Sequence, residues 1–576
     1  MPFISASAIS PYNSIRGGAE GGLVPVSLLL DLYPDALVAY DLRKLSSAYT
    51  GNCIEVRRGS DNAIQDIGFV DGVLDAASLV TFAQGGECYV RTLYDQSGNG
   101  NNATQTVLIN QPQITDSLGA VITKYGKPSI YWYGPANADA SVLIFTEISP
   151  HTVFIAQQLD VQGGAYQQWL LGGSNNDYVS SSSSNVSTGR QYIGAAGNIA
   201  SVRLGSNYMN GELKEFVQAE PNFIRRDTEF NLISMVHDSN ASRLPLASTI
   251  AQRIGLTLQS ALTGWRQSTI IYGTDQSANR VGIERNINSF YNMYWDGSET
   301  GLLDDYPSAA AAYSLRALNS AYTGALVRVR RSNNNEKDIF ARYDGSLDTT
   351  DLLEFVNDGV NTGDGFVTTW YDQSGQGNDA VQASASSQPQ IVSLGVLNET
   401  DTKPSIAFNQ NALVAGTDAI VQDGLAAFAV ATTDAFNRYV PYAKAKAGAT
   451  PNRWGKYSQS FICVDSAETS RVLTYNPSSD FGVNRITTQE IKNDPNALHK
   501  VFENGALFAA ASTTSDPIGS NSFNLVIGVY NDSSGGGSST TYNHLGNISE
   551  LVFYGTDQSA NRVAIETNIN NHYTIY

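Results

Sequence analysis

Residues 93–105 read LYDQSGNGNNATQ, and residues 370–382 read WYDQSGQGNDAVQ. Each stretch joins one Asp to a run of Gly, Ser and Asn, which are the residues that build tight turns. The carboxylates of Asp95 and Asp372 can accept hydrogen bonds from backbone N–H groups that follow them, and the glycines supply backbone angles closed to other residues. We therefore predict two structural loops, formed by Asp95, Gly98 and Gly100 and by Asp372, Gly375 and Gly377.

A calcium ion is the alternative explanation of these loops, because carboxylate and carboxamide oxygens are the ligands that Ca²⁺ prefers. One fixed carboxylate in each loop is few for such a site. The three cysteines form no CxxC pair, and no HxxxH pattern is present. We therefore expect neither a resident metal nor another cofactor.

The two loops belong to a repeat that extends along the whole chain of 576 residues. YGTDQSANRVGIERNIN at residues 272–288, for example, matches YGTDQSANRVAIETNIN at residues 554–570. Each copy is far longer than the unit of a solenoid. We therefore predict two tandem domains, at residues 31–297 and 302–576, which follow an N-terminal arm at residues 1–30.

The pattern within each copy indicates short strands with few helices. Residues 34–47 have helical spacing, whereas CIEVRR at residues 53–58 alternates like a strand, and Asp75 can cap a short helix. The middle of each copy alternates short apolar runs with Gly, Ser and Asn turns. Many short strands without intervening helices are typical of an all-β sandwich.

One helix is predicted to close each copy. Thr274 or Asp275 is the expected N-cap, and apolar residues then recur at helical spacing. The predicted buried stripe of the first copy consists of Ile283, Ile287, Phe290, Tyr291 and Tyr294. In the second copy the stripe includes His572, which we interpret as a packed histidine.

Composition and charge exclude several classes of partner. The formal net charge is −19, which argues against binding to nucleic acid or to an anionic membrane surface. No apolar run is long enough to cross a bilayer, and residues 1–18 lack the pattern of a secretory signal. We therefore expect a protein that is made in a cytoplasm without a signal peptide.

Taken together, these motifs resemble the catalytic domain of the α-L-arabinofuranosidase B enzymes, glycoside hydrolase family 54. The resemblance rests on the YDQSGxGN loop, the SAYTG and VRR segments before it, and the closing YGTDQSANR helix. It covers nearly all of each copy, although the middle third matches weakly. The resemblance implies that each copy is a concanavalin A-like jelly-roll sandwich with a few short helices and a C-terminal helix.

The catalytic residues of that family are matched incompletely. The family's acid/base Asp, which follows an Ile-Gly strand, corresponds to Asp532, whereas Leu256 or Thr257 lies at this place in the first copy. The family's nucleophile is a Glu before Asn-Gly, and its nearest counterpart is Glu503 in FENGALF. Cys88 remains of a cysteine pair in the family, with Ala83 in place of its partner. Asp532 is therefore the one catalytic candidate, and an ordinary turn residue is the alternative for it.

This incomplete match leads us to expect a protein that is not an enzyme. We predict a bacteriophage virion protein, either a head fibre, a capsid decoration or a tail-associated protein, which forms homo-oligomers. The N-terminal arm would attach it to other virion proteins. The alternatives are an arabinofuranosidase-type hydrolase active only in its second domain and a bacterial surface protein that binds carbohydrate.

Lectin-like domains of such a virion protein would bind host surface carbohydrate. Sugar binding uses exposed aromatic rings that stack on the sugar face. The candidates for this role are Trp132, Tyr133 and Trp454. For each of them, packing in the core or at a sheet edge is the alternative.

Overall fold

The computed structural model describes most of the chain, with gaps. The described residues are 28–133, 140–159, 171–172, 190–191, 205–213, 224–225, 231–238, 246–250, 263–298, 300–357, 362–416, 424–434, 439–444, 453–457, 460–464, 470–474, 481–492, 498–512, 524–529 and 543–576. The predicted N-terminal arm therefore lies almost wholly outside the described residues, as do Asp532, Leu256 and Thr257.

Contacts divide the chain into two compact units, unit 1 at residues 1–293 and unit 2 at residues 294–576. Each unit has a hydrophobic core of its own. The exact domain limits of 31–297 and 302–576, given above, stay predictions.

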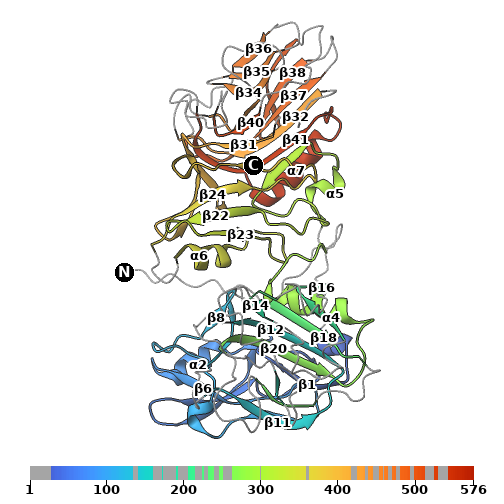
Figure 1. Ribbon diagram of the computed structural model, residues 1–576, viewed down its shortest axis with the longest axis vertical. Helices are drawn as coiled ribbons and strands as arrows, with labels where there is room; N and C mark the ends of the chain where they lie inside the picture. Colours follow the sequence, from blue (N-terminus) through green and yellow to red (C-terminus); the bar gives the residue numbers. More distant parts are fainter. Residues whose placement is uncertain are drawn as a thin grey trace. The chain divides into compact units, whose positions relative to one another are not determined.

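Unit 1 is a sandwich of two antiparallel sheets (Figure 1). The first sheet has the order β1-β20-β12-β18-β15-β16, and β10 pairs with β20 beside β1. Its strands are β1 (Ala36–Asp41), β10 (Ile130–Trp132), β12 (Thr152–Leu159), β15 (Ser206–Met209), β16 (Glu212–Leu213), β18 (Asn231–Val236) and β20 (Gly264–Tyr272).

The second sheet of unit 1 has the order β3-β2-β6-β7-β11-β19-β13. Its strands are β2 (Ile54–Arg58), β3 (Ile64–Ile67), β6 (Cys88–Leu93), β7 (Ala103–Thr104), β11 (Leu143–Ile148), β13 (Leu171–Gly172) and β19 (Ala247–Ile250). Three two-stranded ribbons complete the unit: β4 (Phe69–Val70) with β5 (Val73–Leu74), β8 (Thr123–Lys124) with β9 (Lys127–Pro128), and β14 (Arg190–Gln191) with β17 (Ile224–Arg225).

The described helices of unit 1 are short, except for the closing one. They are α1 (Leu29–Leu32), α2 (Ala76–Ala83), the 3₁₀ turn η1 (Leu108–Asn110) and α4 (Arg280–Tyr291). The predicted cap of α2 is confirmed, because Ser78 N donates to Asp75 Oδ1 over 3.0 Å. The predicted start of the closing helix is wrong, since α4 begins at Arg280 and Asp275 instead accepts from Ser277 N in the turn before it.

Unit 2 repeats this arrangement strand by strand. Its first sheet has the order β21-β41-β32-β37-β38-β39, and β30 pairs with β41 beside β21. Its strands are β21 (Ala311–Ser314), β30 (Ile406–Asn409), β32 (Gly424–Ala431), β37 (Arg485–Lys492), β38 (Leu498–Glu503), β39 (Ala506–Ser512) and β41 (Leu545–Tyr554).

The second sheet of unit 2 has the order β23-β22-β24-β25-β31-β40-β33 and continues through β34, β35 and β36. Its strands are β22 (Val327–Arg331), β23 (Glu336–Ile339), β24 (Gly365–Trp370), β25 (Ala380–Val381), β31 (Leu413–Ala415), β33 (Tyr442–Lys444), β34 (Arg453–Tyr457), β35 (Ser460–Val464), β36 (Ser470–Thr474) and β40 (Leu525–Ile527).

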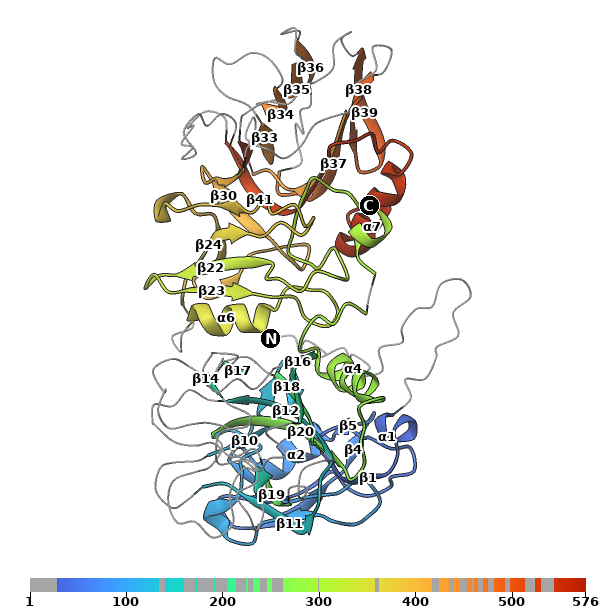
Figure 2. The ribbon, with the colours of Figure 1, turned by 45° about the vertical axis from the view of Figure 1, so that its right-hand side comes forward.

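The remaining elements in the described part of unit 2 are four short strands and its helices. The strands are β26 (Gln390–Ser393), β27 (Val396–Leu397), β28 (Glu399–Thr400) and β29 (Lys403–Pro404), and the helices are α5 (Leu302–Asp305), α6 (Thr349–Asn357), the 3₁₀ turn η3 (Ala385–Ser387) and α7 (Arg562–Tyr573). The helix α7 packs on the first sheet, and α6 on β22 and β23 (Figure 2). The predicted all-β sandwich class is thus confirmed.

One predicted helix is a strand. Residues 34–47 contain β1, whose side chains are almost all buried, including Val38 and Tyr40 in the core. A strand buried on both faces loses the alternation of apolar and polar residues, and its pattern can then be mistaken for that of a helix. Here the first sheet is covered by α4 on one side and by the second sheet on the other.

The YDQSG loop of each unit is joined to the first strand of that unit by hydrogen bonds. Asp95 accepts from the backbone N–H groups of Ala39, Ser97 and Asn101 at 2.9–3.1 Å, and also from the Ser97 hydroxyl. Asp372 accepts the four corresponding bonds in unit 2. The glycines of both loops, Gly98, Gly100, Gly375 and Gly377, have positive φ angles of 70–91°. Both oxygens of each carboxylate therefore already face donors of the protein.

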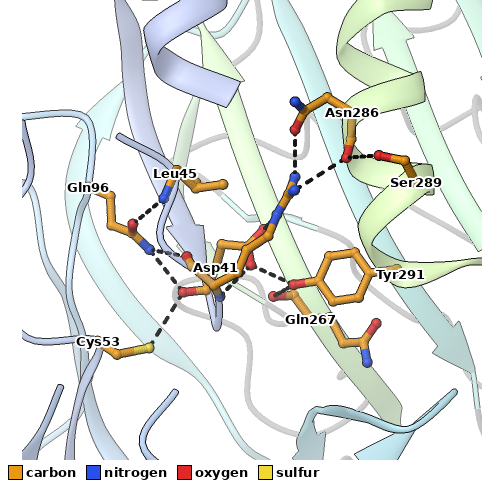
Figure 3. Close-up of polar contacts among 9 residues, drawn as sticks. Asp41, Leu45, Cys53, Gln96, Gln267, Asn286, Ser289 and Tyr291 are labelled. Carbon is orange, nitrogen blue, oxygen red and sulfur yellow. Dashed lines mark hydrogen bonds and ion pairs between the residues drawn. The ribbon is translucent and has the colours of Figure 1, made fainter. Parts of the chain in front are cut away.

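A buried polar cluster joins α4 to the first sheet of unit 1 (Figure 3). Asp41 Oδ1 accepts from the Tyr291 hydroxyl at 2.5 Å and from Arg43 N at 2.8 Å. The Arg43 guanidinium donates to the side chain of Asn286 on α4 over 3.0 Å. Gln96, the residue after Asp95, donates to the backbone carbonyls of Asp41 and Arg43. The Gln of the YDQSG motif therefore holds the turn that presents Asp41 and Arg43 to the helix.

Candidate functional site

The candidate site lies on the inner face of the first sheet of unit 2. This face carries Ile491 and Val501, which belong to the main core, whereas the opposite face of the sheet packs on α7 through residues such as Phe428. Side chains alternate along β37 and β38, so that Arg485, Thr487 and Gln489 lie on the inner face. This part of the face is polar, which is unusual for the interior of a sandwich.

Glu503 ends β38 at the edge of this face. It pairs in register with Thr487, and Asn504 and Gly505 follow it with positive φ angles of 49° and 80° in the turn to β39. Asn-Gly is the preferred sequence for such a two-residue hairpin turn. The Asn504 side chain accepts from Ile486 N at 3.0 Å, which fixes the turn against β37. The carboxylate of Glu503 is therefore held on a rigid element.

The carboxylate of Glu503 faces a buried cation. Arg485 Nε lies 3.9 Å from Glu503 Oε2, and the side chain of Arg485 is 3% exposed against 28% for Glu503. Tyr439 lies beside this pair, with its hydroxyl 3.0 Å from Thr487 Oγ1. Burial raises the pKa of Tyr439 above its ordinary value, and the charge of Glu503 acts in the same direction. The three side chains therefore form one cluster, in which only Glu503 reaches solvent.

His544 packs against this cluster. Its ring packs edge-on against Tyr439 with centroids 5.6 Å apart, and its Nδ1 accepts from Val440 N at 3.1 Å. The bond to Nδ1 places the proton of the neutral imidazole on Nε2. The preceding residue, Asn543, forms a bridge with Val529. Asp532 itself lies outside the described residues, three positions after Val529 in the sequence.

A second histidine lies deeper on the same face. His499 is fully buried on β38 and contacts the side chain of Gln489 at 3.1 Å, and burial lowers its pKa to about 3. The imidazole of His499 is therefore neutral at physiological pH. The pKa of His572 on α7 is likewise lowered to about 3, chiefly by burial.

Unit 1 carries different residues at the corresponding positions. Register in the two sheets pairs Met209 with Ile233, where unit 2 pairs Glu503 with Thr487. An Asn-Gly turn follows in both units. Asn231 occupies the place of Arg485, and Met235 that of Gln489. Among the described residues, unit 1 therefore has no carboxylate at this position.

The sequence-based candidates for sugar stacking are distributed unevenly. Trp132 and Trp454 are at most 1% exposed and belong to the two cores, so neither ring offers a face to a sugar. The structure corrects both expectations, because strand pairing places each ring inside a sandwich. Tyr133 is exposed and lines a pocket in unit 1.

Within the part of the chain that the structure describes, no group of three or more His, Cys, Asp or Glu side chains could hold a metal ion. No helix in that part is long and apolar enough to cross a bilayer. The described cysteines Cys53 and Cys88 are free thiols, and burial raises the pKa of both.

Comparison with known proteins finds one matching family. The model of the α-L-arabinofuranosidase B catalytic domain matches residues 36–122 in unit 1 and 303–422 in unit 2. Both units therefore resemble that domain. Neither matched segment contains Arg485, Glu503 or Asp532.

Curated relatives give the same result over short segments. A probable α-L-arabinofuranosidase B of Aspergillus flavus is 39% identical over 95 residues, which are 15% of this chain and 19% of the relative. An α-L-arabinofuranosidase of Hypocrea jecorina is 47% identical over 64 residues, 11% of this chain and 13% of the relative. The chain thus spans less than a fifth of the length of these relatives.

Among solved structures, a family 54 α-L-arabinofuranosidase soaked with a cyclic sulfate inhibitor is similar at a TM-score of 0.33. The sequence identity is 14%, and the alignment covers 45% of this chain and 62% of the other.

These comparisons overturn the expected function. The prediction of a non-enzymatic bacteriophage virion protein is wrong, as are the virion location and the expectation that the chain is not an enzyme, because the matching family and its curated relatives are glycoside hydrolases of fungi.

Proposed function

We propose that this protein is a glycoside hydrolase of the α-L-arabinofuranosidase type and that its reacting carboxylates belong to unit 2. The observation that carries the proposal is the match of both units to the arabinofuranosidase B catalytic domain. The choice of unit 2 rests on Glu503, since Met209 stands at the corresponding position of unit 1.

A retaining glycosidase uses two carboxyl groups about 5–5.5 Å apart. In the proposed reaction, Glu503 attacks the anomeric carbon of the arabinofuranosyl group as the bond to the leaving oxygen breaks. Asp532 donates its proton to that oxygen and then removes a proton from the water that releases the sugar from Glu503. Each carboxyl group therefore ends the cycle in the protonation state in which it began.

The surroundings of Glu503 support its role as the nucleophile. A nucleophilic carboxylate must be ionised and held in one orientation. Arg485 supplies a buried positive charge 3.9 Å away, and the Asn504 turn fixes the end of the strand. We assign Arg485 as a positioning residue, because it lies beneath the carboxylate and is almost fully buried.

Hydrolysis of an aryl α-L-arabinofuranoside tests the proposal, with release of the phenol as the signal. Turnover of about 10 s⁻¹ is typical of enzymes. We expect Glu503→Gln to lower kcat by about 10²–10⁴-fold or more, because the amide cannot form the glycosyl ester. Met209→Gln is the matched control in unit 1 and should leave kcat unchanged.

A series of leaving groups separates the two carboxylates. Asp532→Asn should slow release of a poor leaving group such as phenol strongly and that of dinitrophenol little, because dinitrophenol departs without a proton. Glu503→Gln should slow both equally. The proposal fails if the wild-type chain releases no phenol from any arabinofuranoside, or if both unit 2 variants keep full activity.

A further inference from the structure

A pocket in unit 1 lies apart from the face discussed above. Its volume is about 610 Å³, within the range of about 300–1,000 Å³ usual for small-molecule sites. It opens between β2, β6, β10 and η1. The side chains used in the argument below are those of Arg57, Glu87, Tyr89, Gln113, Tyr131 and Tyr133.

The walls of the pocket are aromatic and aliphatic. Tyr133 is 54% exposed, and Leu108 and Ile109 on η1 are 48% and 61% exposed. Tyr131 packs against Trp265, with ring centroids 5.2 Å apart, which fixes the orientation of its ring. Exposed apolar side chains that gather around a hollow, as they do here, are typical of a binding surface.

The polar groups of the pocket are held in place and balance in charge. Arg57 donates to Gln111 Oε1 at 2.7 Å, and its guanidinium lies 4.7 Å from the centre of the Tyr89 ring. The Tyr89 hydroxyl donates to Glu87 Oε2 at 2.5 Å. Gln113 Nε2 donates to a backbone carbonyl, which fixes its amide plane. One cation and one anion line the pocket, so its lining favours a neutral ligand.

Unit 2 keeps the frame of this pocket and lacks its aromatic walls. Arg330 bonds to Gln388 and stacks on Phe366, as Arg57 bonds to Gln111 and stacks on Tyr89. In register, however, the counterparts of Tyr131 and Tyr133 are Ala407 and Asn409. The counterparts of Leu108 and Ile109 on η3 are Ala385 and Ser386. The sandwich therefore does not require these apolar residues, which need another explanation.

We propose that the unit 1 pocket binds a neutral oligosaccharide. A sugar ring presents an apolar C–H face, which stacks on tyrosine, and a rim of hydroxyls, which bond to amides and carboxylates. Tyr131 and Tyr133 supply the stacking faces, and Glu87 and Gln113 supply the hydrogen-bonding groups. The proposal is independent of hydrolysis in unit 2, because every residue it uses belongs to unit 1.

Calorimetric titration of the full chain with xylohexaose and with arabinohexaose tests this site. We expect at least one of them to bind. Replacing either tyrosine by its unit 2 counterpart, Tyr133→Asn or Tyr131→Ala, should weaken binding about tenfold, since a lost stacking contact is worth up to about 1.4 kcal/mol. Asn409→Ala in unit 2 is the matched control and should leave the Kd unchanged.

Two further measurements keep the outcomes distinct. The thermal unfolding temperature of Tyr133→Asn should equal that of the wild type, because Tyr133 is largely exposed. Hydrolysis of the aryl arabinofuranoside should also be unchanged in this variant. The inference is overturned if neither oligosaccharide binds, or if binding is unaffected by Tyr133→Asn; a chain that binds but does not hydrolyse would refute only the proposed function.

Discussion

The two units place different chemistry on the same strand positions. Unit 1 carries Met209 and Ile233 where unit 2 carries Glu503 and Thr487. In unit 1, Ile233 belongs to the core, and the polar pair of unit 2 belongs to a cluster with one solvent-accessible carboxylate. The sandwich therefore accepts either an apolar or a polar pair at these positions, because backbone hydrogen bonds and the packing of the opposite face stabilise the strands.

The hairpins that carry these residues occupy the same place in the sheet, but their order along the chain differs between the units. In unit 1, β15 and β16 precede β18, whereas in unit 2, β38 and β39 follow β37. In both units the Asn of the Asn-Gly turn bonds to the strand beside it, Asn210 to Leu232 and Asn504 to Ile486. An edge strand needs a partner on one side only, so either order satisfies the sheet.

The buried ion pair beneath the closing helix also differs between the units. Unit 1 has Asp41 opposite Ser268, and unit 2 has Ser314 opposite Glu550, so the carboxylate has moved to the neighbouring strand. Arg316 donates to both oxygens of Glu550 at 2.8 and 3.0 Å. Arg43 Nε, in contrast, lies 3.6 Å from Asp41 Oδ2. The pair is therefore tighter in unit 2.

Removing the charge of Glu550 should produce the largest effect on stability. Glu550→Gln leaves the Arg316 guanidinium buried without its counter-charge, at a cost of about 3–5 kcal/mol. Asp41→Asn should cost less than about 1 kcal/mol, because Asn can still accept from the Tyr291 hydroxyl. Urea unfolding gives both free energies, and hydrogen exchange of peptides from each unit locates the change. Equal free-energy costs of Glu550→Gln and Asp41→Asn would contradict the inference that the ion pair is tighter in unit 2.

Loss of the loop carboxylates should have a smaller effect, equal in the two units. Asp95→Ala and Asp372→Ala each leave three backbone N–H groups without their acceptor, at a cost of about 1–2 kcal/mol. Thermal unfolding measures both. Unchanged stability together with a loss of calcium or sugar binding would instead indicate a functional loop.

The pH dependence should have opposite signs at the two ion pairs. Burial raises the pKa of Asp41 against the effect of Arg43, so its contribution is present below the unfolded value of about 4 and is lost as the pH rises through its folded pKa. Burial also acts to raise the pKa of Glu550, but Arg316 and its hydrogen bonds hold it below the ordinary value. Its contribution is present above about pH 4.3 and is lost as the pH falls further.

The measurement compares each variant with the wild type from pH 7 down to pH 3. The penalty of Glu550→Gln should shrink at the acidic end of this range, whereas the small penalty of Asp41→Asn should be smallest at neutral pH and grow below about pH 4. Penalties that change in the same direction in both units would contradict the assignment.

The sequence by itself determined the repeat, the all-β class, the strands β2 and β6 and the capped helix α2. The repeat is visible in the letters themselves, the strands show a local alternation of residues, and the cap of α2 joins neighbours in the chain, Asp75 and Ser78, so local patterns record all of them. The closing helix was also recognised, although its first residue was not, because Asp275 caps an earlier turn of its own.

Only the tertiary structure decided which side chains share a face. The sequence shows Glu503 only as a Glu before Asn-Gly. Its neighbours Arg485 and Tyr439 come from separate segments, and no sequence pattern predicts that they lie next to it. The sequence predicted exposed rings for Trp132 and Trp454, whereas strand pairing places both rings in the cores. The strand β1 read like a helix, because burial on both faces removes the alternation by which a strand is recognised. Packing between distant segments decides all of these, and a single sequence carries no direct record of it.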